Sequence, residues 1–576
     1  DLDRAPISVH ARALPMPPTD AEPFSSDTGS SSSSSSSCSS FSQSSSTSSP
    51  PSSVSSSPSS SCPSSPSISP MMTKFRKKLE ANLFFPGPKF ICRGRFRTGE
   101  LVFIRRELNR LGFREIPNTS TEWNVAICIR FQRELWAAVG PYMKVKSIPN
   151  AGTFTRKDRL HESIMHMKRH FSEAEFSFWP RGFNLPTHFQ EWKAYVEAQK
   201  REFPEKQQVW ILKPPLAACG RHIQLVTDVS QVDPESEFIQ KKIPLAQEYL
   251  PKPYLLDGYK ATLRVYVLVC SMDPIRIHVF PNGLVRICSK KYVHDSYDDL
   301  FVHLDSYDIN HVREKDFEGE FSGSLANDGL RCDISTLLTH LDTEHGEGTS
   351  TRVWNDICDV IARSMCAAER TISFWTTKTV KKRHNSFDIF GYDIFLDEHL
   401  KAWLLEINST PSMAPHTKLE NGIKVSMLRT AFKLVDVTAA SIRRRPQLIQ
   451  SRWTALTKVQ ARLKERIEQG ETLTDQEIFA TKLTRPEYWV LLDMCLELLR
   501  AERWQLVLPS RHTTEYLKYL LPNKNVLAHQ FFQLGFTEHS LTQYPFILAK
   551  EENEEEEEEQ GEEEDQDEDH EEDEYE

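Results

Sequence analysis

The chain has 576 residues, enough for two to four domains with a large core. It shows no apolar run long enough for a membrane span, no N-terminal signal pattern and no CxxC pair among its 11 cysteines. We therefore expect neither a membrane segment, nor a disulfide framework, nor a zinc module. The net charge of −11 hides an asymmetry: residues 551–576 hold 20 acidic residues, and the rest has 61 acidic and 70 basic ones. This basic body predicts an anionic partner.

Composition divides the chain into segments. We predict a disordered Ser/Pro-rich segment at 1–73, a small α/β lobe at 74–200, a central part at 201–440, a basic helical extension at 441–548 and a disordered acidic tail at 549–576. Because the sequence begins at Asp1 and contains Met71 and Met72, a fragment of a longer protein is an open alternative.

The lobe at 74–200 predicts strands at 90–95 and 123–131 with a helix at 98–111 between them. The segment RKDRLHESIMHMKRHF, from Arg156, has helical periodicity and a strong positive charge. It predicts either a solvated helix or a basic wall that faces phosphate or an acidic substrate.

Three short strands follow that suit a nucleotide site. Val209–Val226 predicts a strand, a loop with one glycine and a second strand, with Lys213 where its ammonium group could reach a phosphate. Gln247, Glu248 and Tyr249 end the next strand, where backbone groups can read an adenine edge.

The segment Lys260–Cys270 has the clearest strand pattern of the chain. Its period of two places Lys260, Thr262 and Arg264 on one face and apolar residues on the other. Turns at 272–274 and 281–283 predict a β-meander that also presents Arg286. Residues 291–350 are polar and predict loops, and 351–375 predict an amphipathic helix.

The stretch Ser386–Met413 predicts a β-hairpin with its turn at 397–399. Alternation places Glu406 and Asn408 on one face and Trp403, Leu405 and Ile407 on the packed face. Asp393 on the first strand then lies near them. Two carboxylates and an amide suit magnesium, and an edge hairpin with solvated acids is the structural alternative.

The C-terminal part predicts basic helices. Lys424, Arg429, Lys433 and Arg443–Arg445 suggest a docking surface for an acidic partner, or simply solvated faces. Thr474 and Glu477 predict a capping box, and 486–504 a further helix.

Several ordered motifs together resemble the tubulin tyrosine ligase-like enzymes. They are WILKPP, AQEYLPKPYLLDGYKATLRVYV, GLVR, GYDIFLDEHLKAWLLEINSTPSM and LPSRHTTEYL, between about Lys74 and Phe536. RKDRLHESIMHMKRHF, followed by EFSFWPRGFNLP, resembles the polyglutamylase branch of that family. The resemblance implies an α+β ATP-grasp fold. It also implies a ligase in which ATP converts a protein carboxylate into an acyl phosphate, which the amine of an incoming amino acid, here glutamate, attacks.

The resemblance implies a role for each site residue. Asp393, Glu406 and Asn408 would hold Mg²⁺; Lys260, Arg264 and Arg286 would neutralise phosphates and the acyl phosphate; and ATP would contact Lys213, Gln247, Glu248, Tyr249, Leu250 and Lys260. The implied partners are microtubules, through the acidic tubulin tails, and free glutamate. We expect no nucleic-acid or membrane partner, a monomer, and a cytoplasmic, cytoskeletal location that includes the cilium or basal body.

The chain departs from the family pattern at four positions. Thr262 stands in place of an acid, Asp305 and Ser306 replace Thr and Asn, and His222 replaces a glycine and is expected to add bulk near the phosphates. Asp305 is a candidate replacement for the acid absent at Thr262. We expect an active enzyme; a catalytically impaired, microtubule-binding relative is the alternative. The acidic tail could compete for the basic groove, be glutamylated itself or only aid solubility.

Overall fold

The computed structural model describes residues 87–97, 99–140, 143–216, 220–294, 297–305, 331–414, 416–510, 513–522 and 524–536, without the side chains of 439–452 and 455. The predicted segments 1–73 and 549–576, Ser306 and the side chains of Arg443–Arg445 lie outside this description. The chain divides into Asp1–Pro86 and Gly87–Glu576, and the architecture below is that of the second unit. None of its described helices is long and apolar enough to cross a membrane.

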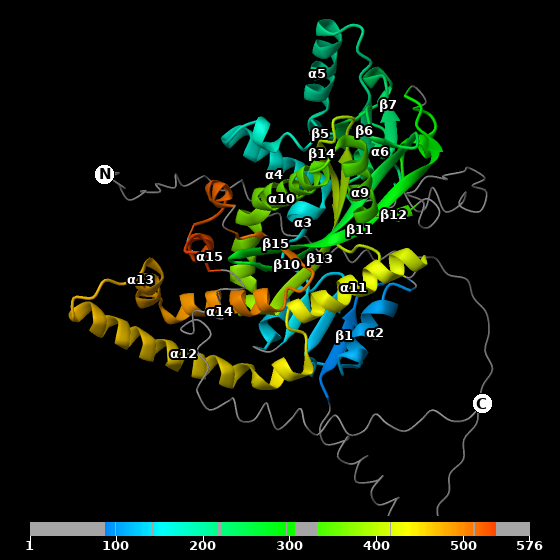
Figure 1. Ribbon diagram of the computed structural model, residues 1–576. Coiled ribbons are helices and arrows are strands. Elements are labelled where there is room, and N and C mark those ends of the chain that lie inside the picture. Colours follow the sequence, from blue (N-terminus) through cyan, green and yellow to red (C-terminus); the bar gives the residue numbers. More distant parts are fainter. Residues whose placement is uncertain are drawn as a thin grey trace, which may run out of the picture. The chain divides into compact units, whose positions relative to one another are not determined.

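An 11-stranded sheet runs through this unit (Figure 1). Its main path is β12 (Arg331–Asp333), β11 (Ile275–Lys291), β10 (Tyr259–Met272), β13 (Ser386–Leu396), β4 (Lys144–Lys146), β3 (Val125–Cys128), β1 (Lys89–Arg93) and β2 (Arg114–Glu115). Off this path, β14 (Ala402–Asn408) pairs with β13, β15 (Gln505–Leu508) with β11, and β9 (Leu255–Leu256) with β10. Along this path, the neighbouring strands β13, β4, β3, β1 and β2 pair in parallel. The other pairs of the sheet are antiparallel.

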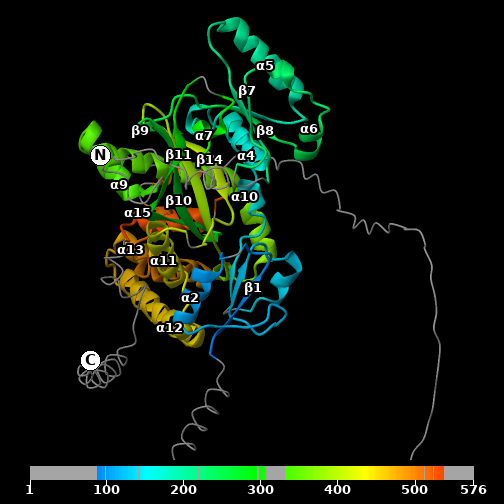
Figure 2. The same cartoon turned by 90° about the vertical axis from the view of Figure 1, so that its right-hand side faces the viewer.

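A separate antiparallel sheet has the order β5 (Gly182–Asn184), β8 (Leu245–Glu248), β6 (Trp210–Lys213) and β7 (Gln224–Val226). Trp192 of α5 (Phe189–Glu202) and Ile239 of α6 (Glu237–Lys242) pack on Trp210 and Leu212 of this sheet. Figures 1 and 2 both show it at the opposite end of the unit from β1 and α2 (Val102–Arg110). The long strands β10, β11 and β13 lie between these two ends.

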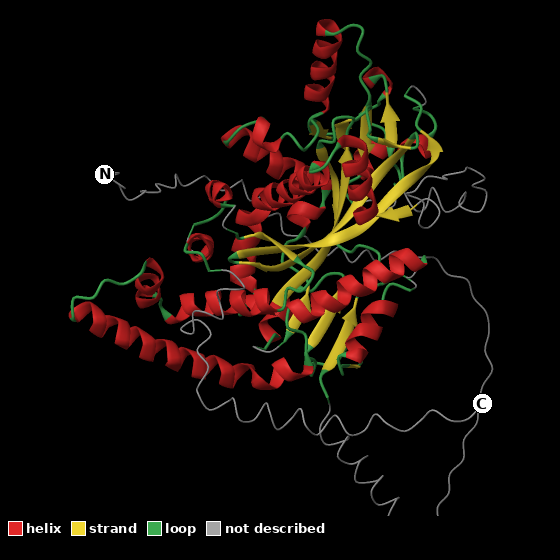
Figure 3. Ribbon diagram, viewed as in Figure 1, coloured by secondary structure: helices red, strands yellow, loops and turns green. Residues whose placement is uncertain are grey.

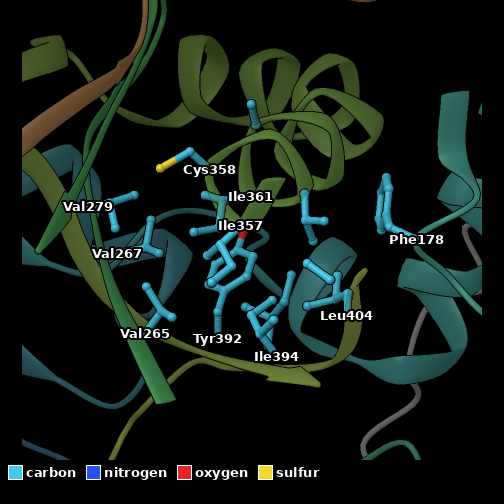
Figure 4. Close-up of a cluster of buried hydrophobic side chains, with 14 of the residues drawn as sticks. Phe178, Val265, Val267, Val279, Ile357, Cys358, Ile361, Tyr392, Ile394 and Leu404 are labelled. Atoms are coloured by element: carbon cyan, nitrogen blue, oxygen red, sulfur yellow. The ribbon is translucent and has the colours of Figure 1, made fainter. Parts of the chain in front are cut away.

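Helices cover both faces of the large sheet (Figure 3). On one face lie α3 (Gly152–Thr155), α4 (Lys157–His170), α9 (Ile334–His345) and α10 (Thr349–Thr379); on the other lie α2 and α11 (Lys418–Leu434). Val265 and Val267 of β10 point toward Ile357 and Ile361 of α10 (Figure 4). Each fully buried side chain of this size contributes about 1.5–3 kcal/mol to folding.

The remaining helices are mostly C-terminal. They are α7 (Leu300–His303), α12 (Ala439–Glu468), α13 (Asp475–Lys482), α14 (Arg485–Leu499) and α15 (Lys524–Gln533), with 3-10 helices η1 (Arg133–Ala138), η2 (Ala174–Phe176), η3 (Val229–Gln231), η4 (Arg383–Asn385) and η5 (Thr514–Tyr519). The predicted capping box of Thr474 and Glu477 is confirmed at the start of α13.

Most predicted elements are present, often shorter than predicted. The predicted lobe has β1, α2 and β3 where strand, helix and strand are expected, and α4, α10, β10 and β13–β14 also match. The helix predicted at 486–504 ends at Leu499, and Gln505–Leu508 instead forms β15, which extends the sheet beside β11.

The turn predicted at 281–283 is wrong, because β11 continues through it as one strand. The register slips here: Val265 pairs with Gly283 but Val267 pairs with Val279. The extra residues form a bulge with Pro281 exposed. A Cβ atom at Gly283 would lie 2.2 Å from the carbonyl oxygen of Arg264, so only glycine fits.

The prediction of loops throughout 291–350 is also wrong. Among the described residues of this range, α7, β12 and α9 are regular. Helix α9 is rich in Ser and Thr and buries only Ile334, Leu337 and Leu341, so its apolar pattern is thin. The sequence feature that indicates this helix is its N-cap residue, Asp333. Its carboxylate accepts a hydrogen bond from the Thr336 N–H at 2.7 Å.

A buried ion pair joins the C-terminal helices to the large sheet. Arg276 Nε on β11 lies 3.1 Å from Glu497 Oε2 on α14, with both side chains at most 7% exposed. Cys270 and His278 lie beside it. Arg276 already neutralises the Glu497 carboxylate. We therefore assign a structural role, and not a metal-binding one, to the cluster of Cys270, Arg276, His278 and Glu497.

We predict that Glu497→Gln lowers the free energy of unfolding by about 3–5 kcal/mol, because it leaves the buried Arg276 charge without its partner. Urea denaturation followed by tryptophan fluorescence measures the effect. The control is Glu237→Gln, which breaks the exposed pair with Lys241 and is expected to cost less than about 1 kcal/mol. Equal shifts of the two midpoints would contradict the assignment.

Candidate active site

One cavity gathers the predicted site residues. Its volume is about 750 Å³, and strands of both sheets line it. All of the residues predicted for metal, nucleotide or intermediate binding are in its wall: Lys213, Gln247, Glu248, Tyr249, Leu250, Lys260, Arg264, Arg286, Asp393, Glu406 and Asn408. The fold therefore brings together residues that are up to 195 positions apart in the sequence.

The hairpin of β13 and β14 brings the three predicted metal ligands together. Asp393 pairs with Glu406 in the strand register. The Asn408 amide nitrogen donates to Asp393 Oδ2 at 3.2 Å and to Glu406 Oε1 at 3.1 Å. Turning this amide over would present its oxygen beside the two carboxylates. Such a set of oxygen donors fits Mg²⁺, which usually keeps several waters or phosphate oxygens as further ligands.

The predicted alternation of β14 is wrong at Trp403 and Leu405, because both are half-buried, whereas Leu404 and Ile407 pack in the core. Ile394 pairs with Leu404 while Asp393 pairs with Glu406, so Leu405 is an extra, bulged residue. As a result Leu404 and Ile407 are buried in the core, whereas Leu405 lines the cavity with Glu406. The bulge turns Glu406 toward Asp393, and bulges are frequent at functional sites for this reason.

Two arginines hold Asp393. Arg264 contacts both of its carboxylate oxygens, at 2.5 and 3.0 Å, and Arg286 Nη2 lies 3.0 Å from Oδ2. Burial alone would raise the pKa of Asp393, but the two guanidinium groups outweigh burial and hold that pKa well below its usual range. Asp393 is therefore a permanent anion, as a metal ligand must be.

Gly391 leaves room for this arrangement. A Cβ atom there would lie 2.9 Å from Arg264 Cδ and 2.9 Å from Pro411 Cβ. The side chain of Arg264 thus reaches Asp393 across a position where any other residue would crowd it.

Two buried lysines also line the cavity. Lys213 Nζ donates to Gln247 Oε1 at 2.8 Å, and Lys260 Nζ donates to the Tyr249 hydroxyl at 3.0 Å. Burial lowers the pKa of Lys213 to about 7; Lys157 and Lys260 act in the same direction and Glu406 opposes them. Burial likewise lowers the pKa of Lys260. Buried lysines with neutral hydrogen-bond partners suit an anionic ligand such as a triphosphate.

The hinge after β8 offers fewer backbone groups than predicted. The Glu248 N–H donates to the Arg181 carbonyl at 2.8 Å and the Tyr249 N–H to the Val209 carbonyl at 2.9 Å. Neither can donate to adenine without losing that bond. Leu250 follows them, lines the cavity and makes no such backbone bond within the described ranges. It is thus the best-placed hinge donor.

The basic helix α4 contributes only its first turn to the cavity. Lys157 Nζ lies 2.8 Å from Glu406 Oε2, and Arg156 also lines the cavity. Farther along, Lys168 pairs with Glu173 and Arg169 is exposed. The prediction of a basic wall thus holds for the start of this helix. Arg169 lies in solvent, as the alternative predicted, whereas Lys168 is buried.

One predicted docking residue is in the cavity instead. Lys424 of α11 is 2% exposed and donates to Glu420 at 2.5 Å, and Arg331 Nε lies 3.1 Å from the other oxygen of Glu420. All three line the cavity. Of the other predicted docking residues, Arg429 pairs with Glu107 and Lys433 with Glu502.

The described residues that depart from the family pattern lie in different places relative to the cavity: Thr262 and Asp305 line it, and His222 does not. Thr262 lies directly opposite Arg286 in the register, and Asp305 Oδ2 lies 3.1 Å from Arg286 Nε. His222 does not crowd the site: its side chain is exposed and outside the cavity wall. Its φ of 59° explains why glycine suits this position.

Sequence reasoning missed several wall residues. They include Arg331, Glu420, Arg95, Arg97 and His303. Arg331 follows a long polar stretch, and Arg95 and Arg97 come from the loop after β1. The local sequence patterns around these residues do not indicate the cavity.

Comparison with known proteins identifies a family and several relatives. A profile described as the Tubulin-tyrosine ligase family matches residues 137–445. Tubulin monoglutamylase TTLL4 of Homo sapiens is 28% identical over 467 residues, covering 77% of this chain and 37% of that protein. Tubulin polyglutamylase TTLL6 of Mus musculus is 31% identical over 346 residues, covering 58% of this chain and 39% of that protein.

A probable beta-tubulin polyglutamylase of Tetrahymena thermophila is 29% identical over 348 residues, covering 59% of this chain and 28% of that protein. The chain thus spans less than two fifths of the length of these relatives. The matched profile covers more than half of the chain and includes every predicted site residue. The chain belongs to the tubulin-tyrosine ligase family.

Proposed function

We propose that this chain is an ATP-dependent protein–glutamate ligase that adds glutamate to glutamate side chains of acidic tubulin tails. The observation that carries the proposal is the single cavity with two kinds of group: the Asp393, Glu406 and Asn408 set, and the cations Lys213, Lys260, Arg264 and Arg286. Both reactants are anions, so fixed cations are needed to bring them together. The relatives named as tubulin glutamylases support the same substrate class.

The two sheets suit an ATP-grasp arrangement with the nucleotide between them. ATP would supply the phosphoryl group that turns the acceptor carboxylate into an acyl phosphate, with Mg²⁺ neutralising the phosphates. Lys213 and Lys260 would neutralise phosphate oxygens, and the Leu250 N–H would donate to adenine. Arg264 and Arg286 would hold the acceptor carboxylate and stabilise the charge that develops as the glutamate amine attacks.

The cavity end beside α11 supports glutamate as the incoming amino acid. Arg331, Glu420 and Lys424 form a cation–anion–cation row there. Free glutamate carries two carboxylates and one ammonium group, so its charges complement that row.

Partners and location follow from the same proposal. We propose microtubules as the macromolecular substrate and a monomer as the working state, with the cytoplasm and cytoskeleton, including the cilium or basal body, as the location. The basic balance of the body outside the acidic tail supports an acidic protein partner. No recognised nucleic-acid motif accompanies this charge.

The second candidate function is a non-catalytic, microtubule-binding relative. Thr262 favours it, because a hydroxyl stands opposite Arg286 where the family pattern has an acid. Magnesium-dependent ATP consumption in the presence of microtubules and glutamate separates the two candidates.

We predict that Glu406→Gln reduces glutamate transfer to microtubules at least about 100-fold, because it removes a charged metal ligand and the partner of Lys157. The assay uses ATP, magnesium and isotope-labelled glutamate, with mass spectrometry of the tubulin tails. The matched control is Glu398→Gln in the turn of the same hairpin, where Glu398 pairs only with exposed Lys252 and His399 among the described residues.

That control should keep wild-type activity. Wild-type protein that binds microtubules but adds no glutamate would refute the ligase and favour the non-catalytic relative.

We also predict that nucleotide affinity falls as the pH rises above about 7. Burial lowers the pKa of Lys213 to about 7, so the free protein loses this charge above that pH, whereas bound phosphate favours the protonated form. Binding at pH 8 should therefore take up nearly one proton, measured by calorimetry in buffers of different ionisation enthalpy. Lys213→Arg stays charged and should abolish this uptake. Equal uptake by both proteins would contradict the role of Lys213.

A further inference from the structure

Arg286 is held by two carboxylates from different parts of the fold. Asp393 on β13 contacts its Nη2, and Asp305, after α7, lies 3.1 Å from its Nε as an ion pair rather than a well-aligned hydrogen bond. Within the described residues these are its two ion-pair partners. The guanidinium is thus fixed at two points, which sets both its position and its rotation.

Asp393 cannot hold Arg286 alone. Its Oδ2 atom is shared among Arg286, Arg264 and Asn408, at 3.0, 3.0 and 3.2 Å. Under the proposed function, Asp393 also binds Mg²⁺, which draws its lone pairs away from the arginines. The ion pair between Asp305 and Arg286 does not depend on that metal.

The register neighbours of Arg286 supply no carboxylate. They are Thr262 on β10 and Arg331 on β12. One offers only a hydroxyl and the other is a like charge. Besides Asp393, the described residue that forms an ion pair with Arg286 is Asp305, which lies outside the strands.

The segment that carries Asp305 is anchored. Asp299 caps α7 by accepting from the Phe301 N–H at 3.0 Å. The His303 ring contacts the Tyr249 hydroxyl at 2.8 Å and stacks on Tyr297. Leu304 packs on the Val209, Ile211 and Tyr249 cluster. The segment that carries Asp305 is thus held by β6 and by the residue that follows β8, as the support of an orienting residue must be.

We propose that Asp305 is a positioning residue that keeps Arg286 in its catalytic orientation, a task that a carboxylate at position 262 could equally perform. The inference rests on the proposed ligase function. It predicts that the charge at 305 can be moved to 262 without loss, since both positions face the same guanidinium.

Four proteins test the exchange: wild type, Asp305→Asn, Thr262→Asp and the double variant. Asp305→Asn should lower kcat for glutamate transfer about 10- to 100-fold, the range expected when a catalytic group is misplaced. It should leave KM for ATP within about threefold, because no phosphate-binding cation is lost. The double variant should recover to within about fivefold of wild type.

The sign of Thr262→Asp is the decisive result. Alone it should lower kcat, because a third carboxylate competes for Arg286 and opposes the phosphates; in the Asp305→Asn background it should raise kcat. Asp299→Asn is the control for mere loosening of α7, and Thr262→Asp should not rescue it. Melting temperatures verify that every variant folds.

Additive effects of the two substitutions, or an unchanged kcat in Asp305→Asn, would overturn the inference while leaving the ligase intact. A folded wild-type protein without glutamate transfer would overturn the ligase and this inference together.

Discussion

The structure depends on burying many charges in one cavity, most of them beside an opposite charge among the described residues. Moving a charged group out of water costs several kcal/mol of solvation free energy unless oppositely charged neighbours replace the solvent. Here cations and anions alternate around the wall: Asp305, Arg286, Asp393 and Arg264 form one row, Lys157 and Glu406 a pair, and Arg331, Glu420 and Lys424 another row. The lysines beside the hinge have neutral partners instead, which leaves that end ready for an anion.

The fold supplies these neighbours through strand register. Arg264, Asp393 and Glu406 lie side by side on β10, β13 and β14. Helix packing on both faces fixes the strands, so the register cannot slip without moving core residues such as Val265 and Tyr392 to the wrong face. Three local devices then adjust the site: the bulge at Leu405, the bulge before Gly283 and the space left at Gly391. The same core that stabilises the chain therefore also sets the geometry of the cavity.

Period-two patterns predicted β10 and most of the hairpin, because alternation reports which face is buried. They could not predict the bulges, which break alternation through one or a few residues. Motif resemblance predicted the wall residues from Lys213 to Asn408. It could not predict Arg331 or Lys424, since β12 and α11 reach the cavity only through tertiary packing. Lys424 shows the limit most clearly: its basic helical surroundings suggested a docking surface or a solvated face, yet the side chain is buried against Glu420.

The most direct test of the central claim follows one oxygen atom. Ligation should proceed through phosphoryl transfer to the acceptor carboxylate, so a tubulin-tail peptide with ¹⁸O in its glutamate carboxylates should pass one ¹⁸O to inorganic phosphate for each glutamate added. Mass spectrometry of the phosphate and the peptide measures both quantities in one reaction. Equal amounts of labelled phosphate and new amide bond are the predicted result. Glutamate addition with unlabelled phosphate would contradict an acyl-phosphate route through this cavity.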